Sequence, residues 1–592
     1  MHVIATAGHV DHGKSTLIRA LTGIEPDRLD EERRRGMTID LGYAWTTLSD
    51  GTPVAFVDVP GHQRFVTNML AGIGPVPAVL LVVAADEGWS RQTTEHLAAL
   101  EALGVSRGIL AVTRADLGDV DLAVEEARDY LAGTGLEGIE AVGVSAVTGR
   151  GLTEVRAAIE RLVAALPTPN LDVTRLWVDR VFTIRGAGTV VTGTLGCGRL
   201  AVGDELVVAA SGETVHIRGI ETMKTAHDSV DAVARVALNL RGTTRATLGR
   251  GDALVRPGQW THTDLIDVRL TNVTGRVPAH PIVHVGSAAV SARFRPFDEQ
   301  SARLHLAQRL PLHIGDRVIL RDPGPQHVVA GAVVLDVLPP ALARRGSAMV
   351  RAREMGAMPE AADLHSELSR RRAVRRSTLS AAGVALPATE TSSVVAVGDW
   401  LVVEPQWADW TGALQEAVKA WAKAHPLQPA MPAGAVSHAL GLPDASFVAP
   451  LVAGVADLTV DGDGVHARDS AAVLPAEIRS ALDDLAERLT TRPFDVPEAH
   501  ELASAGLTDR YLAVATKRGD LVRVAHGIYL RPSALARAVE LLAQLPQPFT
   551  VSEARQALGT TRRVAVPLLE LLDRQRATRR VDDQRREIAP AR

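Results

Sequence analysis

Residues 8–15 of the chain, GHVDHGKS, match the pattern G-x-x-x-x-G-K-[ST] and constrain the fold more than any other stretch. The apolar run HVIATAG leads into them and STLIRALTG follows, which predicts a buried strand, a tight loop and a helix. The loop amides and the helix N-terminus can then cradle phosphates, and Lys14 would reach the β- and γ-phosphates. Repeated apolar runs with helical stretches between them predict an α/β nucleotide-binding domain over residues 1–168.

The residues that follow supply other groups that phosphate transfer needs. RGMTID places Thr38 in a loop, where its hydroxyl and that of Ser15 would ligate Mg²⁺. VAFVDVPGH predicts a strand that ends at Asp58, which would act on Mg²⁺ through water, and His62 is placed to orient an attacking water. The predicted phosphate-binding residues are Gly8, Val10, Asp11, His12, Gly13, Lys14, Ser15, Thr16, Asp58 and Gly61.

Two further motifs predict which base the site accepts. GILAVTRAD is another apolar run, and it ends in Thr113, Arg114 and Asp116. The carboxylate of Asp116 can accept both N–H donors of a guanine edge, which adenine does not offer. AVGVSAVTG supplies Ser145 and Ala146, whose backbone is expected to contact guanine O6. These motifs predict a guanine nucleotide.

GHVDHGKST, RGMTID, DVPGH and TRAD together resemble the GTPase domain of translation factors related to elongation factor Tu. The resemblance implies that the domain binds GTP and Mg²⁺ and hydrolyses GTP to GDP. It also implies that His62 is catalytic, with Val10 and Met37 as an apolar gate beside it. Thr113 and Arg114 depart from the family pattern Asn-Lys-x-Asp. Guanine specificity should survive through the aspartate, and the aliphatic stem of the arginine can lie over the purine.

Beyond residue 168 the pattern changes to alternating strands with tight turns. LWVDRVFTIRGAGTVVTGTL alternates around a Gly-Ala-Gly turn, which predicts a β-barrel over residues 169–257. A second β-rich stretch predicts another barrel over residues 258–340. This order resembles the architecture of the elongation factor Tu family, in which the three domains together grip the acceptor arm of an aminoacyl-tRNA.

The C-terminal third of the chain is mostly helical. A helix, two shorter helices and a strand pair recur about every 60 residues, as a winged-helix module requires. Four tandem winged-helix modules are predicted, over residues 341–410, 411–475, 476–534 and 535–592.

The last predicted module is basic. From Pro546 to Arg592 ten arginines stand against six acidic residues. Such a balance on a helix-turn-helix is typical of a nucleic-acid module. A solvated arginine face is the alternative, because arginines also cluster at 370–372 and 375–376. The predicted mRNA contacts are Arg562 and Arg563, at the start of the second helix, and Arg579 and Arg580, in the wing.

Winged helices beyond two barrels extend the resemblance, over the whole length, to bacterial selenocysteine-specific elongation factors. It implies that the last module grips an mRNA hairpin, and that GTP hydrolysis commits delivery of selenocysteinyl-tRNA to the ribosome at a UGA codon. It also places Arg180 and Arg235 of the first barrel in a pocket for the selenol, which is ionised at neutral pH. Exposed strand arginines are the alternative.

Composition limits the compartment and the partners. The chain has 592 residues, a formal net charge of −5 and one cysteine, Cys197. A single cysteine cannot form an internal disulfide, which fits a reducing cytoplasm. No apolar run predicts a signal peptide, a transmembrane helix or a membrane partner, and a monomer is expected.

Three other functions share part of the pattern. A general carrier of aminoacyl-tRNAs would leave the C-terminal third unexplained. A GTP-controlled, DNA-binding regulator would use the winged helices on duplexes but would leave the two barrels without a role. The GTPase subunit of sulfate activation shares the GTPase domain and the barrels but should lack winged helices.

Overall fold

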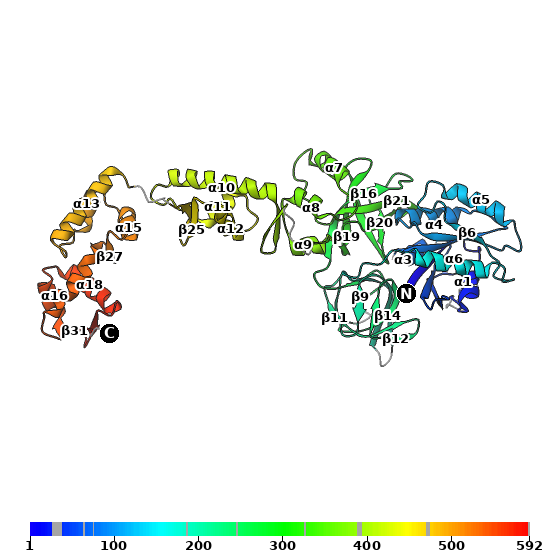
Figure 1. The fold of residues 1–592 in the computed structure, drawn as a ribbon, viewed down its shortest axis with the longest axis horizontal. Coiled ribbons are helices and arrows are strands. Elements are labelled where there is room, and N and C mark those ends of the chain that lie inside the picture. The colour runs from blue at the N-terminus through cyan, green and yellow to red at the C-terminus, as the bar shows by residue number, and fades with distance from the viewer. Residues whose placement is uncertain are drawn as a thin grey trace. The chain divides into compact units, whose positions relative to one another are not determined.

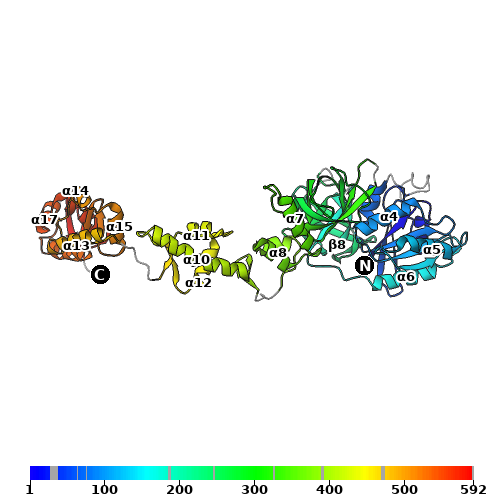
Figure 2. The same ribbon diagram turned by 90° about the horizontal axis from the view of Figure 1, so that it is seen from above.

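The computed structural model describes residues 1–26, 38–62, 65–74, 76–184, 188–243, 247–324, 327–387, 393–468 and 474–589. The chain forms two compact units, Met1–Val403 and Glu404–Arg592, which are described separately below. Figures 1 and 2 show both units in two perpendicular views. The first unit contains an α/β domain, two β-barrels and the first winged helix, and the second contains the other winged helices. The predicted fold class is confirmed.

The N-terminal domain is a six-stranded sheet in the order β2-β3-β1-β4-β5-β6, in which only β2 runs antiparallel to its neighbour. Alternate residues of its buried strands face two separate cores. Helices α1 and α6 cover one face, and α3, α4 and α5 cover the other. The strands are β1 (His2–Gly8), β2 (Gly42–Thr47), β3 (Pro53–Asp58), β4 (Ala78–Ala84), β5 (Gly108–Thr113) and β6 (Glu140–Gly143). The helices are α1 (Lys14–Thr22), α3 (Val66–Ile73), α4 (Arg91–Ala102), α5 (Val120–Leu131) and α6 (Leu152–Ala164).

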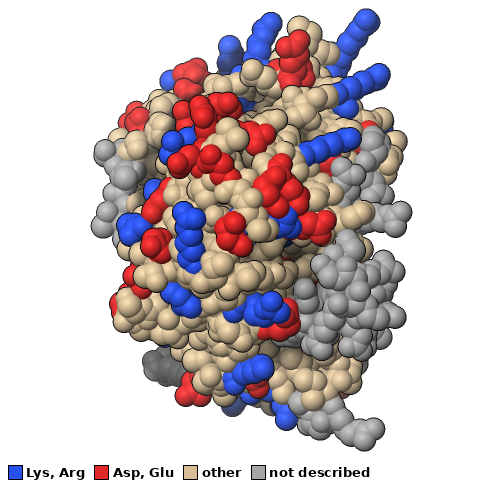
Figure 3. Space-filling model, turned by 90° about the vertical axis from the view of Figure 1, so that its right-hand side faces the viewer, with Lys and Arg blue, Asp and Glu red and all other residues tan. Residues whose placement is uncertain are grey.

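The face of the first unit that Figure 3 shows carries charges of both signs. Among the described residues drawn there, basic and acidic side chains are interspersed (Figure 3). A face of this kind is typical of a solvated surface.

The first barrel has six strands in the order β10-β15-β7-β8-β14-β11, and pairing of β10 with β11 closes it. Its interior is filled by aliphatic side chains, among them Leu176, Val191 and Leu238. The strands are β7 (Arg175–Ile184), β8 (Gly188–Cys197), β10 (Glu205–Val208), β11 (Thr214–Thr222), β14 (Ala234–Arg241) and β15 (Ala253–Val255). Three short strands lie beside it: β9 (Arg199–Ala201), β12 (Thr225–His227) and β13 (Ser229–Asp231).

The second barrel is closed in the order β16-β19-β18-β17-β20-β21. Strand β18 shows why these residues form a barrel wall, because its first six residues alternate between buried and accessible positions. The strands are β16 (Thr261–Thr271), β17 (Ile282–Val285), β18 (Ala288–Pro296), β19 (Ser301–Leu312), β20 (Arg317–Arg321) and β21 (Val328–Asp336).

The first winged helix packs against the second barrel. Its Leu368, Leu379 and Leu401 belong to the same hydrophobic core as Leu304 and Leu312 of the barrel. The elements are α7 (Ser347–Ala357), α8 (Leu364–Arg371), β22 (Ala373–Arg375), α9 (Arg376–Ala381), β23 (Val394–Val397) and β24 (Trp400–Val403). The next helix begins directly at Glu404, so the first module is seven residues shorter than the predicted range 341–410.

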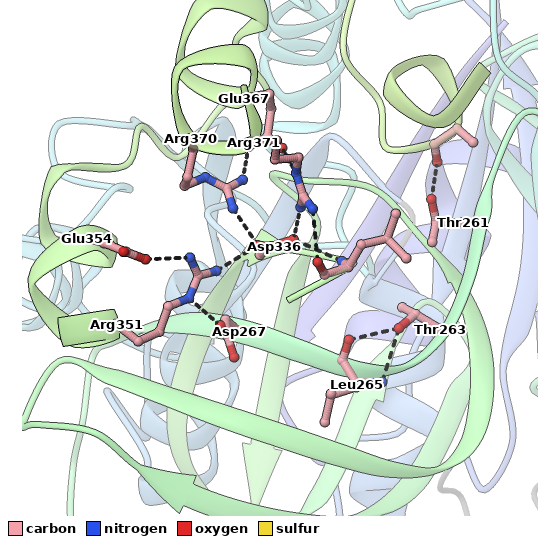
Figure 4. Close-up of polar contacts among 12 residues, drawn as sticks. Thr261, Thr263, Leu265, Asp267, Asp336, Arg351, Glu354, Glu367, Arg370 and Arg371 are labelled. Carbon is pink, nitrogen blue, oxygen red and sulfur yellow. Dashed lines mark hydrogen bonds and ion pairs between the residues drawn. The ribbon is translucent and has the colours of Figure 1, made fainter. Parts of the chain in front are cut away.

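A buried cluster of arginines and carboxylates joins this winged helix to the barrel (Figure 4). Arg351 donates hydrogen bonds to Asp267 and Asp336, over 2.7 and 2.6 Å. Arg370 and Arg371 also donate to Asp336, over 2.7 and 2.5 Å. Both carboxylates are 0% exposed and Arg351 is 2% exposed. We call the set Asp267, Asp336, Arg351, Arg370 and Arg371 the barrel latch.

Two arginines of the sequence cluster 370–372, Arg370 and Arg371, are therefore half-buried and paired with Asp336. Burial alone would raise the pKa of Asp336, but the guanidinium groups of Arg371 and Arg370 outweigh burial and hold this pKa below its usual value. Asp336 stays ionised, and its arginines are committed to it. The clustering of arginines at this place in the sequence reflects packing against the barrel.

In the second unit, α10 packs against α11 and α12, and the strand pair β25–β26 completes the module. The elements are α10 (Glu404–Ala424), α11 (Ala433–Leu440), η2 (Ala445–Phe447), α12 (Val448–Ala453), β25 (Leu458–Asp461) and β26 (Gly464–Ala467). Within the described residues no single helix is long and apolar enough to cross a membrane, although the bent pair Ala433–Leu440 and Ala445–Ala453 meets that criterion together.

The last two modules share one hydrophobic core, which includes Leu489, Leu530 and Leu568. The third contains α13 (Ala476–Thr491), α14 (Ala499–Ser504), α15 (Asp509–Lys517), β27 (Val522–Ala525) and β28 (Ile528–Leu530). The fourth contains α16 (Pro532–Ala543), β29 (Phe549–Thr550), α17 (Val551–Ala557), α18 (Arg562–Arg574), β30 (Thr578–Arg580) and β31 (Arg585–Ile588). Helix α16 begins three residues before the predicted start at 535.

Candidate nucleotide site and RNA interface

The predicted phosphate loop lies between β1 and α1, at the carboxyl end of the sheet. Lys14 is buried, and its Nζ donates to the carbonyls of Gly8 and His9, over 3.0 and 2.7 Å. The loop thus wraps around the ammonium group. Gly13 caps α1 in the left-handed conformation, with φ 76°. Asp11 and Thr16 are exposed on either side of this turn.

The predicted metal ligands come together. The Ser15 hydroxyl lies 3.0 Å from that of Thr38 and donates to Asp58 over 2.6 Å. Thr6 donates to the other oxygen of Asp58 over 2.7 Å, which fixes the carboxylate. Two hydroxyls and a carboxylate are hard oxygen ligands of the kind that Mg²⁺ prefers, so the residues fit that ion.

The segment after β3 lies against the phosphate loop. A Cβ atom on Gly61 would stand 2.5 Å from the Val10 nitrogen and 2.8 Å from Lys14 Nζ, so only glycine allows this approach. His62 follows, half-buried, with its ring centroid 6.0 Å from that of Phe65. Met37, the predicted partner of Val10 in the apolar gate, lies outside the described residues.

The predicted guanine loop is tied to the phosphate loop. Thr113 donates its hydroxyl to the His12 carbonyl over 2.7 Å, so this hydroxyl braces the loop where the family pattern has an asparagine. Asp116 is exposed and has no hydrogen-bond partner within the described part of the chain. Ser145 is buried and accepts a hydrogen bond from the Thr148 amide over 3.2 Å, and Ala146 beside it is half-buried.

Helix α4 contributes two residues that the sequence motifs do not include. The Gly8 amide donates to Nδ1 of His96 over 3.0 Å, and the Val10 amide donates to Gln92 over 3.4 Å. Burial, with Lys14 nearby, lowers the pKa of His96 to about 3, so the ring is neutral and can accept. The spacing i, i+4 puts Gln92 and His96 on one helix face, which is the only signal in the sequence.

Comparisons with known proteins agree with this geometry. Residues 1–165 match the family model of the elongation factor Tu GTP binding domain. Elongation factor Tu 2 of Streptomyces avermitilis is 32% identical over an alignment of 374 positions, which covers 56% of this chain and 95% of that protein. The chain belongs to the elongation factor Tu family.

Regions of this elongation factor Tu family member outside the GTP-binding domain match two further family models. Residues 271–341 match the beta-barrel domain of selenocysteine-specific elongation factor, and residues 540–586 match the winged helix of elongation factor SelB. The selenocysteine-specific elongation factor of Desulfomicrobium baculatum is 39% identical over 374 residues, 60% of this chain, and the chain spans only 59% of its length. The crystal structure of a bacterial factor EF-Sec shares the fold over the whole of both chains, with a TM-score of 0.75 and 24% identity.

Arg180 and Arg235 lie where the first barrel of this elongation factor Tu relative meets strand β2. Their side chains are 17% and 13% exposed, so the alternative of exposed strand arginines is wrong. Arg180 donates to Asp40 over 2.9 Å and Arg235 to Asp179 over 2.7 Å, and both guanidinium groups lie over the Tyr43 ring. Arg180, Arg235 and Tyr43 line a cavity of about 300 Å³.

The four predicted RNA contacts of the last module differ in their surroundings. Arg563 donates to the carbonyls of Val496 and Pro497, over 2.9 and 3.2 Å, and so holds the third module. In the wing, Arg579 pairs with Glu587, and Arg580 lies 3.6 and 3.8 Å from Asp573 and Glu570.

Arg562 differs from those three. It is exposed, and it has no ion pair or hydrogen bond to any side chain that the structure describes. A cation in the first turn of a helix is disfavoured by the helix dipole. An external phosphate would offset this cost, so Arg562 is the strongest of the four candidates for RNA.

Proposed function

We propose that this elongation factor Tu family member delivers selenocysteinyl-tRNA to the ribosome at UGA codons marked by an mRNA hairpin, and that it binds GTP and hydrolyses it to GDP in the process. The match of residues 540–586 to the winged helix of elongation factor SelB carries this proposal. The elongation factor Tu of Streptomyces avermitilis aligns over 95% of its own sequence with only 56% of this chain. The C-terminal modules are additional, and a factor that must read a messenger signal needs an additional RNA-binding part.

The nucleotide site has the groups that such a GTPase requires. Lys14 and the loop amides would hold the phosphates, and Asp116 would accept the guanine N–H groups. Ser15 and Thr38 would ligate Mg²⁺ directly, and Asp58 would act through water. Mg²⁺ neutralises charge on the phosphate oxygens when it is bound.

His62 has a distinct part in this proposal. It would orient the attacking water beside the γ-phosphate, and Val10 and Met37 would exclude other water until the ribosome is engaged. Positioning and charge stabilisation, rather than covalent chemistry, would supply the rate enhancement.

The amino-acid pocket is proposed around Arg180 and Arg235. A selenol is ionised at neutral pH and a serine hydroxyl is neutral, so cationic groups discriminate between them. Burial opposes the charge of Arg235, but Asp179 outweighs burial and raises the pKa of Arg235 further, so it stays cationic. Asp179 already neutralises part of this charge, and a selenolate would have to share Arg235 with it.

Protection of the aminoacyl ester tests the function directly. With GTP, the full chain is expected to slow hydrolysis of selenocysteinyl-tRNA strongly and that of seryl-tRNA on the same tRNA weakly. Arg235→Met should remove this difference. Equal protection of both esters by the unmodified chain would favour a general carrier, and tighter binding of duplex DNA than of any RNA hairpin would favour a regulator.

A further inference from the structure

Three loops of the nucleotide-binding domain meet at the guanidinium of Arg114. Its NH1 donates to Asp86 over 2.9 Å and to Glu87 over 2.6 Å, and both acids lie in the loop after β4. Its NH2 donates to the carbonyl of Asp11 in the phosphate loop. Arg114 itself belongs to the predicted guanine loop. One side chain therefore connects the loop for the base, the loop for the phosphates and an acidic loop that has no assigned role.

The backbone of the guanine loop adopts an unusual conformation at Arg114 and packs closely against the acidic loop at Gly118. Arg114 has φ 52°, in the left-handed region that residues with a Cβ atom adopt only at a cost. Four residues later the guanine loop presses on the acidic loop, because a Cβ atom on Gly118 would stand 2.3 Å from the Ala85 carbonyl oxygen. The guanidinium contacts and the backbone hydrogen bonds of this turn hold Arg114 in this conformation.

The charges support the same conclusion. The side chains of Arg114 and Asp86 are 29% and 28% exposed, and that of Glu87 is 44% exposed. Partial burial disfavours the cation, but the hydrogen bonds that Arg114 donates to Glu87 and Asp86 outweigh it and raise the pKa of Arg114 above its usual value. Two carboxylates on one guanidinium hold it more firmly than a single surface pair would.

We propose that Asp86 and Glu87 are positioning residues, which act through Arg114 to fix the position of the guanine loop relative to the phosphate loop. They would thereby set how long a guanine nucleotide stays bound and how strongly guanine is preferred over hypoxanthine. The inference rests on the proposed GTP site. Arg114 stands where the family pattern has a lysine. This difference matters because an arginine guanidinium can engage two carboxylates and a carbonyl at once, whereas a lysine ammonium group is a point charge.

The test is a double-mutant cycle on the full chain. Asp86→Asn with Glu87→Gln is made in the unmodified chain and in an Arg114→Met chain, and the release of a fluorescent GDP analogue is timed by a chase with unlabelled GDP. The acid variant is expected to release the nucleotide about 5- to 10-fold faster in the unmodified chain, and no faster than its parent beside Arg114→Met. Competition between GDP and IDP, which lacks the 2-amino group, should show a smaller preference for GDP in the acid variant.

The control separates positioning from simple electrostatics. Removing any nearby negative charge favours an anionic ligand, so Asp121→Asn, on the exposed first turn of α5, should slow release slightly. Equal acceleration in both Arg114 backgrounds, slower release by the acid variant, or an unchanged preference for GDP would overturn the inference. Failure of the unmodified chain to bind any guanine nucleotide would instead overturn the proposed function and, with it, the inference. Matched melting curves show that each variant is folded.

Discussion

Arg563 donates a 2.9 Å hydrogen bond to the backbone carbonyl of Val496, 67 positions earlier in the chain. This bond crosses from the fourth winged helix to the third, which share one hydrophobic core. Arg562, its neighbour in sequence, has no hydrogen bond to the third module among the residues that the structure describes. Two adjacent arginines of one basic motif are therefore expected to have different functions.

Replacing each of the two arginines separately tests this division. Arg562→Ala should weaken binding of a labelled RNA hairpin by about 1 to 3 kcal/mol and make its salt dependence shallower by about one counterion. Arg563→Ala should leave the salt slope unchanged and lower the melting temperature of the second unit. Arg492→Ala, at an exposed arginine of the same unit, is the control for lost surface charge. If Arg563→Ala reduces hairpin binding as Arg562→Ala does, the division is wrong.

The barrel latch predicts a large cost for Arg351. Arg351→Met would leave Asp267 and Asp336 buried with one cation fewer, and breaking a buried ion pair costs about 3 kcal/mol or more. Urea unfolding of the full chain should show this loss in the transition of the first unit. Arg353→Met, on the exposed face of the same helix, should change little. Equal effects of the two changes would mean that the latch contributes no more than surface charge.

Guanine specificity should depend on Asp116. Asp116→Asn replaces an acceptor of two N–H groups by an amide, which can donate to the C2 carbonyl of xanthine. The variant is expected to prefer XTP to GTP in a competition measurement, with unchanged melting because the side chain is exposed. A retained preference for GTP would contradict the assigned role.

Loss of the proposed water-orienting group should affect hydrolysis and not binding. His62→Ala is expected to lower ribosome-stimulated, single-turnover GTP hydrolysis by at least ~100-fold. GTP affinity, measured in the same preparation, should stay near that of the unmodified chain. Unchanged turnover would remove His62 from catalysis.

Buried histidines make the first unit sensitive to acid. Burial lowers the pKa of His284, in the second barrel, to about 3. The folded state holds this ring neutral, while the unfolded chain protonates it below pH 6.5, so its contribution is complete above pH 6.5 and is lost as pH falls towards 3. Between pH 8 and pH 5 the loss should be about 2 kcal/mol. His284→Leu should flatten the dependence of the unfolding free energy on pH, whereas His305→Leu, at an exposed histidine of the same barrel, should leave its shape unchanged.

Local patterns predict why Ser15 and Asp58 come together, because each lies at or just after the carboxyl end of an apolar strand and parallel strands end at the same edge of the sheet. Thr38 joins them because β2, which it precedes, runs antiparallel to β3 and begins where β3 ends. Partners of these residues are less predictable. Nothing in the motif TRAD indicates that Arg114 contacts Asp86 and Glu87. Sequence periodicity predicts the strands, but it does not predict which side chains of two neighbouring loops pair.

Basic clusters are the part that sequence predicts least. Arg370 and Arg371 stand in an arginine-rich string much like that of the last module, yet they are turned inward on Asp336. The deciding carboxylate comes from a strand of another domain, so composition cannot reveal it. A local signal bears on the end of the first module: Pro405 near the start of α10 is a helix-start signal, and the predicted boundary at 410 lies inside this helix.

The barrel latch also determines where this chain can be divided to make fusion proteins. A cut after residue 340 would leave Asp336 in one piece and its three arginines in the other, whereas a cut between Val403 and Glu404 leaves every charged group of the latch with its partners. Fusions that exchange the winged helices of the second unit for other domains should therefore keep the first winged helix with the barrels. The first winged helix would then belong to the constant part of every such fusion.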